Sequence, residues 1–359
     1  MKNHITVLGI FFLTFIGCDT DLVTKVNHDN AKLQFMGRIA QSDSTSELYW
    51  SGTSVEIVFE GTELSATLKD GGKNYYNVII DNDSIYTLDL EKGKKKYKLV
   101  ESLGEGKHSV KLFRRTEWTY GKTSFYGFSF DEATEVLAIA KKQKNIEFYG
   151  NSITSGWAVE DYSGKDNAKG TNTNNWYSYA AVTARHFDAD YTCISRGGIG
   201  VTVSWYPMRM SEMYDRLNPD DANSKWDFTK STPDVVVVNL LQNDAFLVVK
   251  PNNNQFKERF GETAPTDEFL SNAYADFIST IRGKYPNAEI VCLLGNMTIT
   301  QEGSKWPTIV AKAVNSLKDE KISTVFVPYK NTPGHPRIEE QQIIADSLIS
   351  NINKNINWN

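Results

Sequence analysis

The run DVVVVNLL, residues 234–241, is apolar almost throughout and has the length of a single β-strand. A strand with apolar side chains on both faces needs cover on both faces, which a parallel sheet flanked by helices provides. Four further apolar runs share this character, at 146–149, 191–194, 288–294 and 323–328. Segments typical of helices alternate with these runs: WYSYAAVTARHF, DEFLSNAYADFISTIRGKY, WPTIVAKAVNSL and EEQQIIADSLISNI. Five strands with intervening helices predict a doubly wound α/β domain over residues 140–357.

Residues 31–132 have a different pattern of apolar and turn-forming residues. Short β-like runs are broken by Gly, Asp and Asn, as in SVEIVFEG, ELSATLKDGG, YYNVIIDND and SFYGFSFD, and no helical stripe is present. Regular spacing with turn signals predicts an antiparallel sandwich or jelly roll. A chain of 359 residues, 40% of them hydrophobic, is long enough for two such domains.

The N-terminus begins MKNHITVLGIFFLTFIGC, with a basic start, an apolar core from Ile5 to Ile16 and Gly17 directly before Cys18. This pattern is typical of a signal peptide over residues 1–17, followed by a polar linker over 18–30. A small residue before cysteine resembles a lipobox, which implies lipidation of Cys18 and an anchor in a bacterial cell envelope, on its periplasmic face or at the cell surface. The alternative is an ordinary signal peptide with an incidental cysteine.

Charge argues against nucleic acid as a partner, and the number and spacing of cysteines argue against disulfide bonds and metal sites. The net charge is −5, and the short run Lys94–Lys96 is not a basic stripe, so nucleic acid is not expected as a partner. Beyond Cys18, the cysteines are Cys193 and Cys292, both in apolar strand-like runs, which favours buried thiols over a disulfide. No metal-ligand spacing is present, and we expect neither metal nor cofactor.

The first apolar run of the α/β half ends in GNSIT, residues 150–154. A strand that ends in Gly-x-Ser before a helix places the hydroxyl of Ser152 beside backbone N–H groups that can stabilise an oxyanion. The alternative for Ser152 is a helix N-cap. A nucleophilic serine needs a base, and His335 fits best because it precedes the last helix, at the carboxyl edge of the sheet. The other histidines are in less suitable places: His4, His28, His108 and His186.

Four blocks, GNSIT, SRGGIG, NLLQND and GHP, stand in the order of the SGNH, or GDSL-type, hydrolases, and the chain resembles that superfamily. The β half narrows the match. The segments FMGRI, LYWSGTSVEIVFEGTEL, GEGKHSV and LFRRTEWTYG resemble the N-terminal jelly roll of carbohydrate esterase family 2, as FYGNSIT and MSEMYDR resemble its catalytic half. The similarity covers roughly residues 35 to 350.

The resemblance implies roles for the matching residues. Ser152 would be the nucleophile and His335 the base, and the oxyanion would be bound by the backbone N–H groups of Ser152 and Gly198 and by the side-chain amide of Asn243. Gly198 as a simple turn and Asn243 as a strand-ending cap are the structural alternatives.

The chain departs from the superfamily pattern at three positions. Asn151 replaces the usual aspartate, a bulky Leu241 is expected to alter the pocket wall, and Thr332 stands three residues before the histidine, where many relatives carry an orienting aspartate. We therefore expect a Ser-His dyad with no acid assigned. A carboxylate from elsewhere, such as Asp161 or Asp244, is the open alternative.

Family 2 enzymes remove acetyl groups from plant polysaccharides, with an aromatic side chain in the cleft against the sugar. The resemblance implies the same here, and the candidates are Trp205, followed by Tyr206 and Trp157. The expected substrate is acetylated hemicellulose, xylan or glucomannan. Two alternatives remain: acetyl groups on peptidoglycan or host glycans as the substrate, and a glycan-binding lipoprotein without catalytic activity.

Overall fold

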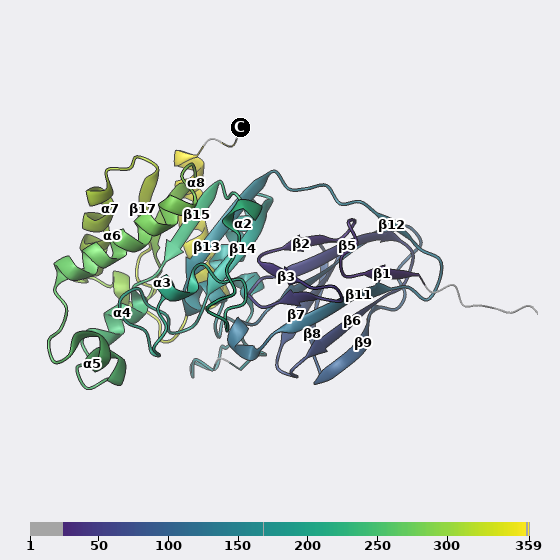
Figure 1. The fold of residues 1–359 in the computed structure, drawn as a ribbon, viewed down its shortest axis with the longest axis horizontal. Helices are drawn as coiled ribbons and strands as arrows, with labels where there is room; N and C mark the ends of the chain where they lie inside the picture. Colours follow the sequence, from purple (N-terminus) through teal and green to yellow (C-terminus); the bar gives the residue numbers. More distant parts are fainter. Residues whose placement is uncertain (1–23, 168, 357, 359) are drawn as a thin grey trace, which may run out of the picture.

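The computed structural model describes residues 24–167, 169–356 and 358, and within them the chain forms two halves joined end to end (Figure 1). Residues 25–137 form a sandwich of two antiparallel sheets. One sheet has the order β3-β4-β11-β6-β9, with β1 also paired to β11; the other has the order β12-β5-β10-β7-β8, with β2 also paired to β5. The strand bounds are β1 Lys25–Asn27, β2 Gln34–Met36, β3 Ile39–Gln41, β4 Ser46–Leu48, β5 Ser54–Glu60, β6 Leu64–Asp70, β7 Tyr75–Ile80, β8 Ser84–Asp89, β9 Gly93–Val100, β10 Lys107–Arg114, β11 Thr123–Ser129 and β12 Glu135–Leu137.

Alternating apolar residues build the core between the two sheets. On β5, Val55, Ile57 and Phe59 are fully buried and pack in the same cluster as Leu64 and Leu68 of β6. Side chains two apart on a strand lie on the same face, so this alternation directs one face of each sheet inward. The predicted antiparallel sandwich is confirmed.

The sandwich extends beyond both predicted domain bounds. β1, within the predicted linker at 18–30, pairs with β11, and β12, beyond residue 132, pairs with β5. Each of these strands has three residues, and only Val26 of β1 and Val136 of β12 are buried. Strands this short have too few alternating positions to stand out in the sequence.

The second half contains a five-stranded parallel sheet in the order β14-β13-β15-β16-β17, as predicted. Its strands are β13 Lys144–Gly150, β14 Ala189–Ser195, β15 Val235–Asn239, β16 Glu289–Leu294 and β17 Ile322–Phe326. Its helices are α1 Ser152–Ser155, α2 Tyr179–His186, α3 Met210–Met213, α4 Gln242–Leu247, α5 Asn254–Phe260, α6 Asp267–Lys284, α7 Trp306–Leu317 and α8 Ile338–Asn355. Short 3-10 helices lie at Trp118–Tyr120 (η1), Asn175–Tyr177 (η2), Phe228–Lys230 (η3) and Thr298–Thr300 (η4).

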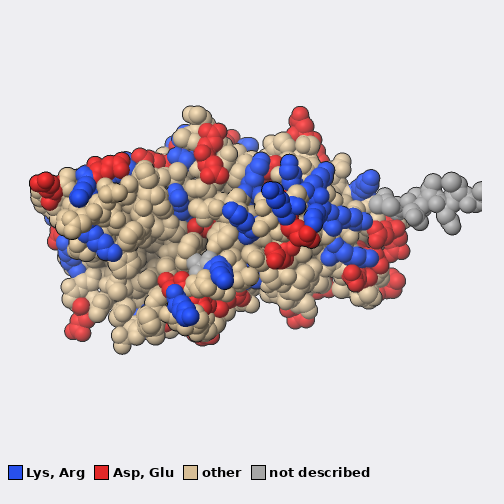
Figure 2. Space-filling view, turned by 90° about the horizontal axis from the view of Figure 1, so that it is seen from below, with Lys and Arg blue, Asp and Glu red and all other residues tan. Residues whose placement is uncertain are grey.

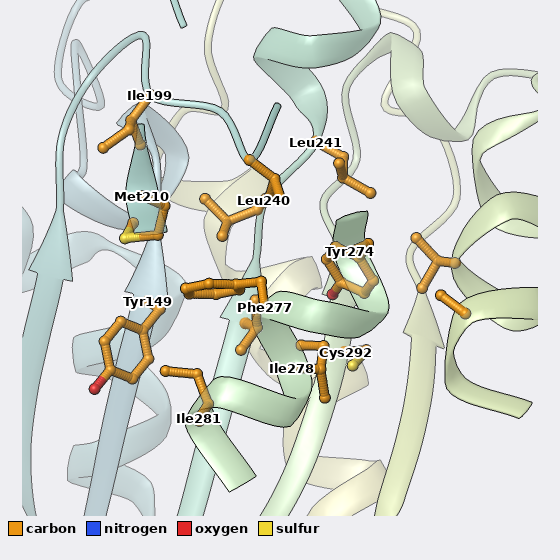
Figure 3. Packing of buried hydrophobic residues seen from close by; sticks show 14 of the residues in the cluster. Tyr149, Ile199, Met210, Leu240, Leu241, Tyr274, Phe277, Ile278, Ile281 and Cys292 are labelled. Atoms are coloured by element: carbon orange, nitrogen blue, oxygen red, sulfur yellow. The ribbon is translucent and has the colours of Figure 1, made fainter. Parts of the chain in front are cut away.

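Each face of the parallel sheet has its own apolar core. Tyr149 and Cys292 point to one face, where they pack in one cluster with Tyr274, Phe277 and Ile278 of α6 (Figure 3). The neighbouring strand residues point to the opposite face and pack with α2 and α8: Ile146, Phe148, Val235, Val237, Val291 and Leu293. Cover on both faces explains why these strands are nearly continuous apolar runs. Cys193 and Cys292 are buried free thiols, as expected.

A buried arginine joins the two halves. Arg38 follows β2, and its guanidinium reaches Glu147 of β13, with 2.8 Å between Nη2 and Oε1 and both side chains fully buried. Its Nη1 also donates to the carbonyl oxygens of Tyr214 and Arg216, at 2.6 and 3.0 Å. A buried charge is tolerated only when it is paired and hydrogen-bonded, and Arg38 meets that condition across the boundary between the two halves.

Lysine and arginine gather over the sandwich in the view of Figure 2. The edge strand β9 contributes exposed lysines, among which Lys96 pairs with Asp131 at 3.1 Å and Lys98 with Glu63 at 2.7 Å. Charged side chains on an edge strand discourage pairing with another chain. No helix in the described residues is long and apolar enough to cross a bilayer. The predicted signal peptide and Cys18 lie outside those residues.

Candidate active site

The turn after β13 frees the hydroxyl of Ser152. Asn151, not Ser152, is the N-cap of α1, because its side-chain oxygen accepts a hydrogen bond from the N–H of Ile153 at 3.0 Å. A Cβ atom on Gly150 would lie 1.9 Å from Oγ1 of Thr154, so only glycine fits where the strand meets the helix. The alternative in which Ser152 is itself the cap is therefore wrong.

Ser152, His335 and Asp166 form a chain of hydrogen bonds. Oγ of Ser152 lies 2.7 Å from Nε2 of His335, which stands in the loop between β17 and α8. On the other side of the ring, Nδ1 lies 2.7 Å from Oδ2 of Asp166, in the loop between α1 and η2. The backbone N–H of His335 also donates to Oδ1 of Asp166, at 2.8 Å. The expected dyad without an acid is therefore corrected to a triad geometry.

The surroundings of Asp166 keep it ionised. Partial burial alone would raise its pKa, but the hydrogen bonds and the charge of His335, with the Arg337 guanidinium 3.6 Å away, lower the pKa to about 2. An ionised carboxylate favours the tautomer of His335 with the proton on Nδ1, which leaves Nε2 free to accept the proton of Ser152.

The residues that the sequence offered as sources of an acid have other partners. Asp161 accepts hydrogen bonds from the backbone N–H groups of Ser163 and Asn167. Asp244 is fully buried and accepts from the backbone N–H groups of residues 201–203. Thr332, at the position of the usual aspartate, accepts from Lys330 at 2.6 Å. None of these three side chains is bonded to His335.

The three residues expected to supply the oxyanion donors line the same cleft. The backbone N–H groups of Ser152 and Gly198 donate to no other group in the described part of the chain, and both residues line one cleft with Asn243. Nδ2 of Asn243 donates to the carbonyl of Ile199 at 2.8 Å, and its Oδ1 accepts from the indole Nε1 of Trp205 at 3.1 Å. An amide nitrogen carries two hydrogens, so one N–H of Asn243 remains for a ligand.

The cleft has a volume of about 420 Å³ and is mostly apolar. Its lining residues are Ser152, Trp157, Gly197, Gly198, Trp205, Tyr206, Gln242, Asn243, Phe246, Met297 and His335. All three predicted aromatic residues are thus in the cleft wall. Trp205 is 44% exposed, with the ammonium of Lys250 4.7 Å from its ring centre, whereas the Arg196 guanidinium covers one face of Tyr206 at 3.3 Å. Trp205 therefore offers the more accessible ring.

Leu241 does not contribute to the cleft wall. Its side chain is fully buried in the core against α6 (Figure 3), and its backbone has φ +74°. The left-handed backbone at this position turns the apolar side chain into the core while the next residues, Gln242 and Asn243, line the cleft. The expectation that Leu241 alters the pocket wall is wrong for this reason.

Comparisons with known proteins agree with this geometry. Residues 35–139 match the family model described as carbohydrate esterase 2 N-terminal. The structure of a family two carbohydrate esterase from Clostridium thermocellum, in complex with cellohexaose, has a TM-score of 0.80 and 31% identity, and the match covers 90% of this chain and 98% of that one. The chain belongs to carbohydrate esterase family 2.

Two curated relatives differ in how much of their own length this chain covers. The cellulase/esterase CelE of Acetivibrio thermocellus is 31% identical over 344 residues, which are 92% of this chain but only 40% of that protein's length. An acetylxylan esterase / glucomannan deacetylase of Cellvibrio japonicus is 28% identical over 84% of both chains. Family 2 membership thus extends over nearly the whole described chain, sandwich and α/β half together.

Proposed function

We propose that this protein is a serine esterase that removes acetyl groups from hemicellulose poly- or oligosaccharides, such as acetylated xylan or glucomannan. The observation that carries this function is the hydrogen-bonded chain from Ser152 through His335 to Asp166, which opens on an aromatic cleft. Among the described residues, no group of three or more His, Cys, Asp or Glu side chains could hold a metal ion.

The reaction follows from the positions of the groups. Oγ of Ser152 attacks the acetyl carbonyl while Nε2 of His335 takes its proton, and the oxygen that becomes negative is bound by the N–H groups of Ser152, Gly198 and Asn243. The tetrahedral intermediate then expels the sugar oxygen, which takes the proton from His335 and leaves as a hydroxyl. His335 next takes a proton from water, which attacks the acetyl-enzyme. Acetate leaves, and His335 returns that proton to Oγ of Ser152.

The names of the relatives and the cleft support a carbohydrate substrate. The Cellvibrio relative is named for acetylxylan and glucomannan, and the Clostridium structure holds cellohexaose. In this protein the exposed ring of Trp205 lies beside Asn243, so a sugar stacked on the indole would present its acetyl group near the oxyanion donors.

The test is acetate release from 4-nitrophenyl acetate and from acetylated xylan and glucomannan by residues 19–359, beside Ser152→Ala and His335→Ala. We expect wild type to turn over and each variant to lose at least about 10³-fold in kcat, because nucleophile and base act as a unit. Acetylated muropeptides and host-type O-acetyl glycans extend the comparison to the other possible substrates. If the folded wild type is as inactive as Ser152→Ala, the esterase function is wrong. Glycan binding by the cleft without catalysis would then be the remaining function.

We also propose that Cys18 is lipidated after removal of residues 1–17, which would anchor the enzyme at the cell envelope. The sequence pattern before Cys18 supports this. Incorporation of a labelled fatty acid into the full-length chain, and its loss in Cys18→Ser, is the expected result. A signal peptide cleaved without any label in the wild type would contradict it.

A further inference from the structure

The turn that carries Gly198 is held from both sides at the preceding residue, Gly197. The N–H of Gly197 donates to Oε2 of Glu117 at 2.7 Å, and its carbonyl oxygen accepts from the hydroxyl of Tyr206 at 2.9 Å. Glu117 belongs to the sandwich, in the loop between β10 and β11, whereas Tyr206 follows the turn in the α/β half. Two side chains from different halves thus fix the two peptide groups that flank one glycine.

The bond from Tyr206 determines where the N–H of Gly198 points. The carbonyl of Gly197 and the N–H of Gly198 belong to one planar trans peptide group, in which the C=O and the N–H point in opposite directions. Once the hydroxyl of Tyr206 holds the carbonyl on one side, the N–H of Gly198 faces the other side. That N–H is the expected oxyanion donor, and Gly198 lines the cleft.

Glu117 holds the turn from a fully desolvated position. Its carboxylate is buried, and besides Gly197 it accepts hydrogen bonds from the hydroxyls of Thr119 at 2.6 Å and Ser155 at 3.3 Å. Ser155 belongs to α1, the same short helix that begins with Ser152. The carboxylate therefore connects the Gly197 turn to the nucleophile's helix, and both connect to the sandwich.

The side chain of Arg196 packs against aromatic rings from both halves beside the Gly197 turn. The Arg196 guanidinium lies 3.3 Å from the ring centre of Tyr206 and 4.7 Å from that of Trp118, the residue after Glu117. Burial raises the pKa of Glu117, and the hydrogen bonds from Thr119 and Gly197 with the charge of Arg196 act against that rise. Rotation of the Gly197 turn would break contacts on both of its faces at once.

We propose that Glu117 and Tyr206 are positioning residues that hold the N–H of Gly198 toward the oxyanion, so that the sandwich half supports the transition state through the Gly197 turn. This rests on the proposed function, because it deepens the role of Gly198 in that reaction. Loss of one oxyanion donor typically costs ~10²–10³ in kcat. A donor that is present but misaligned should lose part of that, about 10- to 100-fold.

The experiment compares Tyr206→Phe and Glu117→Ala with matched controls. Tyr285→Phe removes a buried tyrosine hydroxyl that donates to Glu147 at 2.9 Å, and Trp50→Phe removes a donor that bonds the carbonyl of Leu217 across the two halves at 2.9 Å. Glu117→Gln is the conservative rescue, because its amide oxygen can still accept from Gly197 while its NH₂ group meets the hydroxyl of Thr119.

For each variant, kcat and KM for 4-nitrophenyl acetate, the inhibition constant of a phenylboronic acid, and the thermal unfolding midpoint are measured. A boronic acid forms a tetrahedral adduct with the serine and places an oxygen at the oxyanion position. We expect Tyr206→Phe and Glu117→Ala to lose about 10- to 100-fold in kcat with little change in KM, and to weaken the boronic acid in proportion. Glu117→Gln and the two controls should stay within about threefold of wild type.

The possible failures are distinguishable. If Tyr206→Phe and Glu117→Ala retain wild-type kcat and boronic acid affinity, the positioning role is wrong while the esterase stands. Losses that merely follow the unfolding midpoint, and that appear equally in Tyr285→Phe and Trp50→Phe, also overturn it. If the boronic acid does not bind the wild type and Ser152→Ala changes nothing, the proposed function itself fails.

Discussion

Asp166 and His335 are 169 residues apart in the chain, yet one carboxylate binds both the backbone N–H and the imidazole of His335. The backbone contact fixes the position of the loop, and the side-chain contact fixes the rotation of the ring. The superfamily resemblance implies an orienting aspartate three residues before the histidine, where this chain has Thr332; here the carboxylate that contacts the imidazole is that of Asp166.

Replacing Asp166 by asparagine should lower kcat by about 10²–10⁴-fold, because the ring loses the charge that stabilises its protonated form and the acceptor that selects its tautomer. Steady-state kinetics with 4-nitrophenyl acetate measures this. Thr332→Ala is the control: its hydroxyl bonds Lys330 and Glu340, and kcat should change little. Equal kcat values for Asp166→Asn and wild type would instead support a Ser152–His335 dyad that works without an acid.

The low pKa of Asp166 predicts how its contribution to stability depends on pH. Its pKa in the folded protein, about 2, is below the ordinary value of 3.8, so the folded state favours the ionised form. The contribution is fully present above about pH 4 and is lost as the pH falls toward 2. The difference in unfolding midpoint between wild type and Asp166→Asn should therefore shrink as the pH falls from about 4 toward 2. A difference that stays constant over that range would contradict the contact.

Gly198→Ala should reduce kcat by about 10²-fold or more. Gly198 has φ +82°, and an added Cβ would lie 3.2 Å from Cε1 of Tyr206 and 3.3 Å from Cδ1 of Trp205, so the turn must shift. Gly303→Ala is a matched control, because Gly303 has φ +81° with open space around the added Cβ. Both variants should lose stability through backbone strain, but only Gly198→Ala should lose turnover. Parallel kinetics in the two would contradict the role of Gly198.

Trp205 should serve two purposes that two substitutions separate. Trp205→Phe keeps an aromatic ring but removes the N–H that holds Oδ1 of Asn243, so kcat should fall about tenfold on every ester. Trp205→Ala removes the ring as well. The binding free energy for acetylated xylan should then weaken by about 1–3 kcal/mol, the size of stacking between a flat ligand and an aromatic ring, and KM should rise accordingly. An unchanged KM on polymer in Trp205→Ala would move the sugar site elsewhere in the cleft.

Arg38→Met should destabilise the protein by about 3–5 kcal/mol, because it leaves Glu147 buried without its cation. Denaturant unfolding measures the change. The double variant Arg38→Met with Glu147→Gln should be more stable than Arg38→Met alone, since the uncompensated charge is gone. If the double variant instead shows the sum of the two single losses, the two residues are not energetically coupled.

The fold was predictable because its signals are local. The runs at 146–149 and 234–241 are apolar on consecutive residues, and strands buried on both faces have this composition. β1 and β12 were missed because three residues give no period to detect. Leu241 has a left-handed backbone that turns its side chain away from the cleft. A leucine at that position does not predict this conformation, because left-handed backbone is typical of glycine.

The site was predictable only in part. Ser152, Gly198, Asn243 and His335 each stand in a recognisable block, and the structure brings all four around one cleft. Asp166 lies in a polar loop with other acidic residues, such as Asp161, and no local pattern distinguishes the one that meets His335. A contact over 169 residues depends on how the loop after α1 folds back toward α8, which the sequence encodes only through the whole fold.

The contacts of the Arg38 guanidinium limit how the two halves of the chain can be exchanged in evolution. It comes from the sandwich, but its partners, Glu147 and the carbonyls of Tyr214 and Arg216, all belong to the α/β half. A fragment of residues 140–357 alone would keep that carboxylate buried without its cation. Evolutionary exchange of one half for the corresponding half of another protein should therefore be disfavoured unless Arg38 and Glu147 are exchanged together.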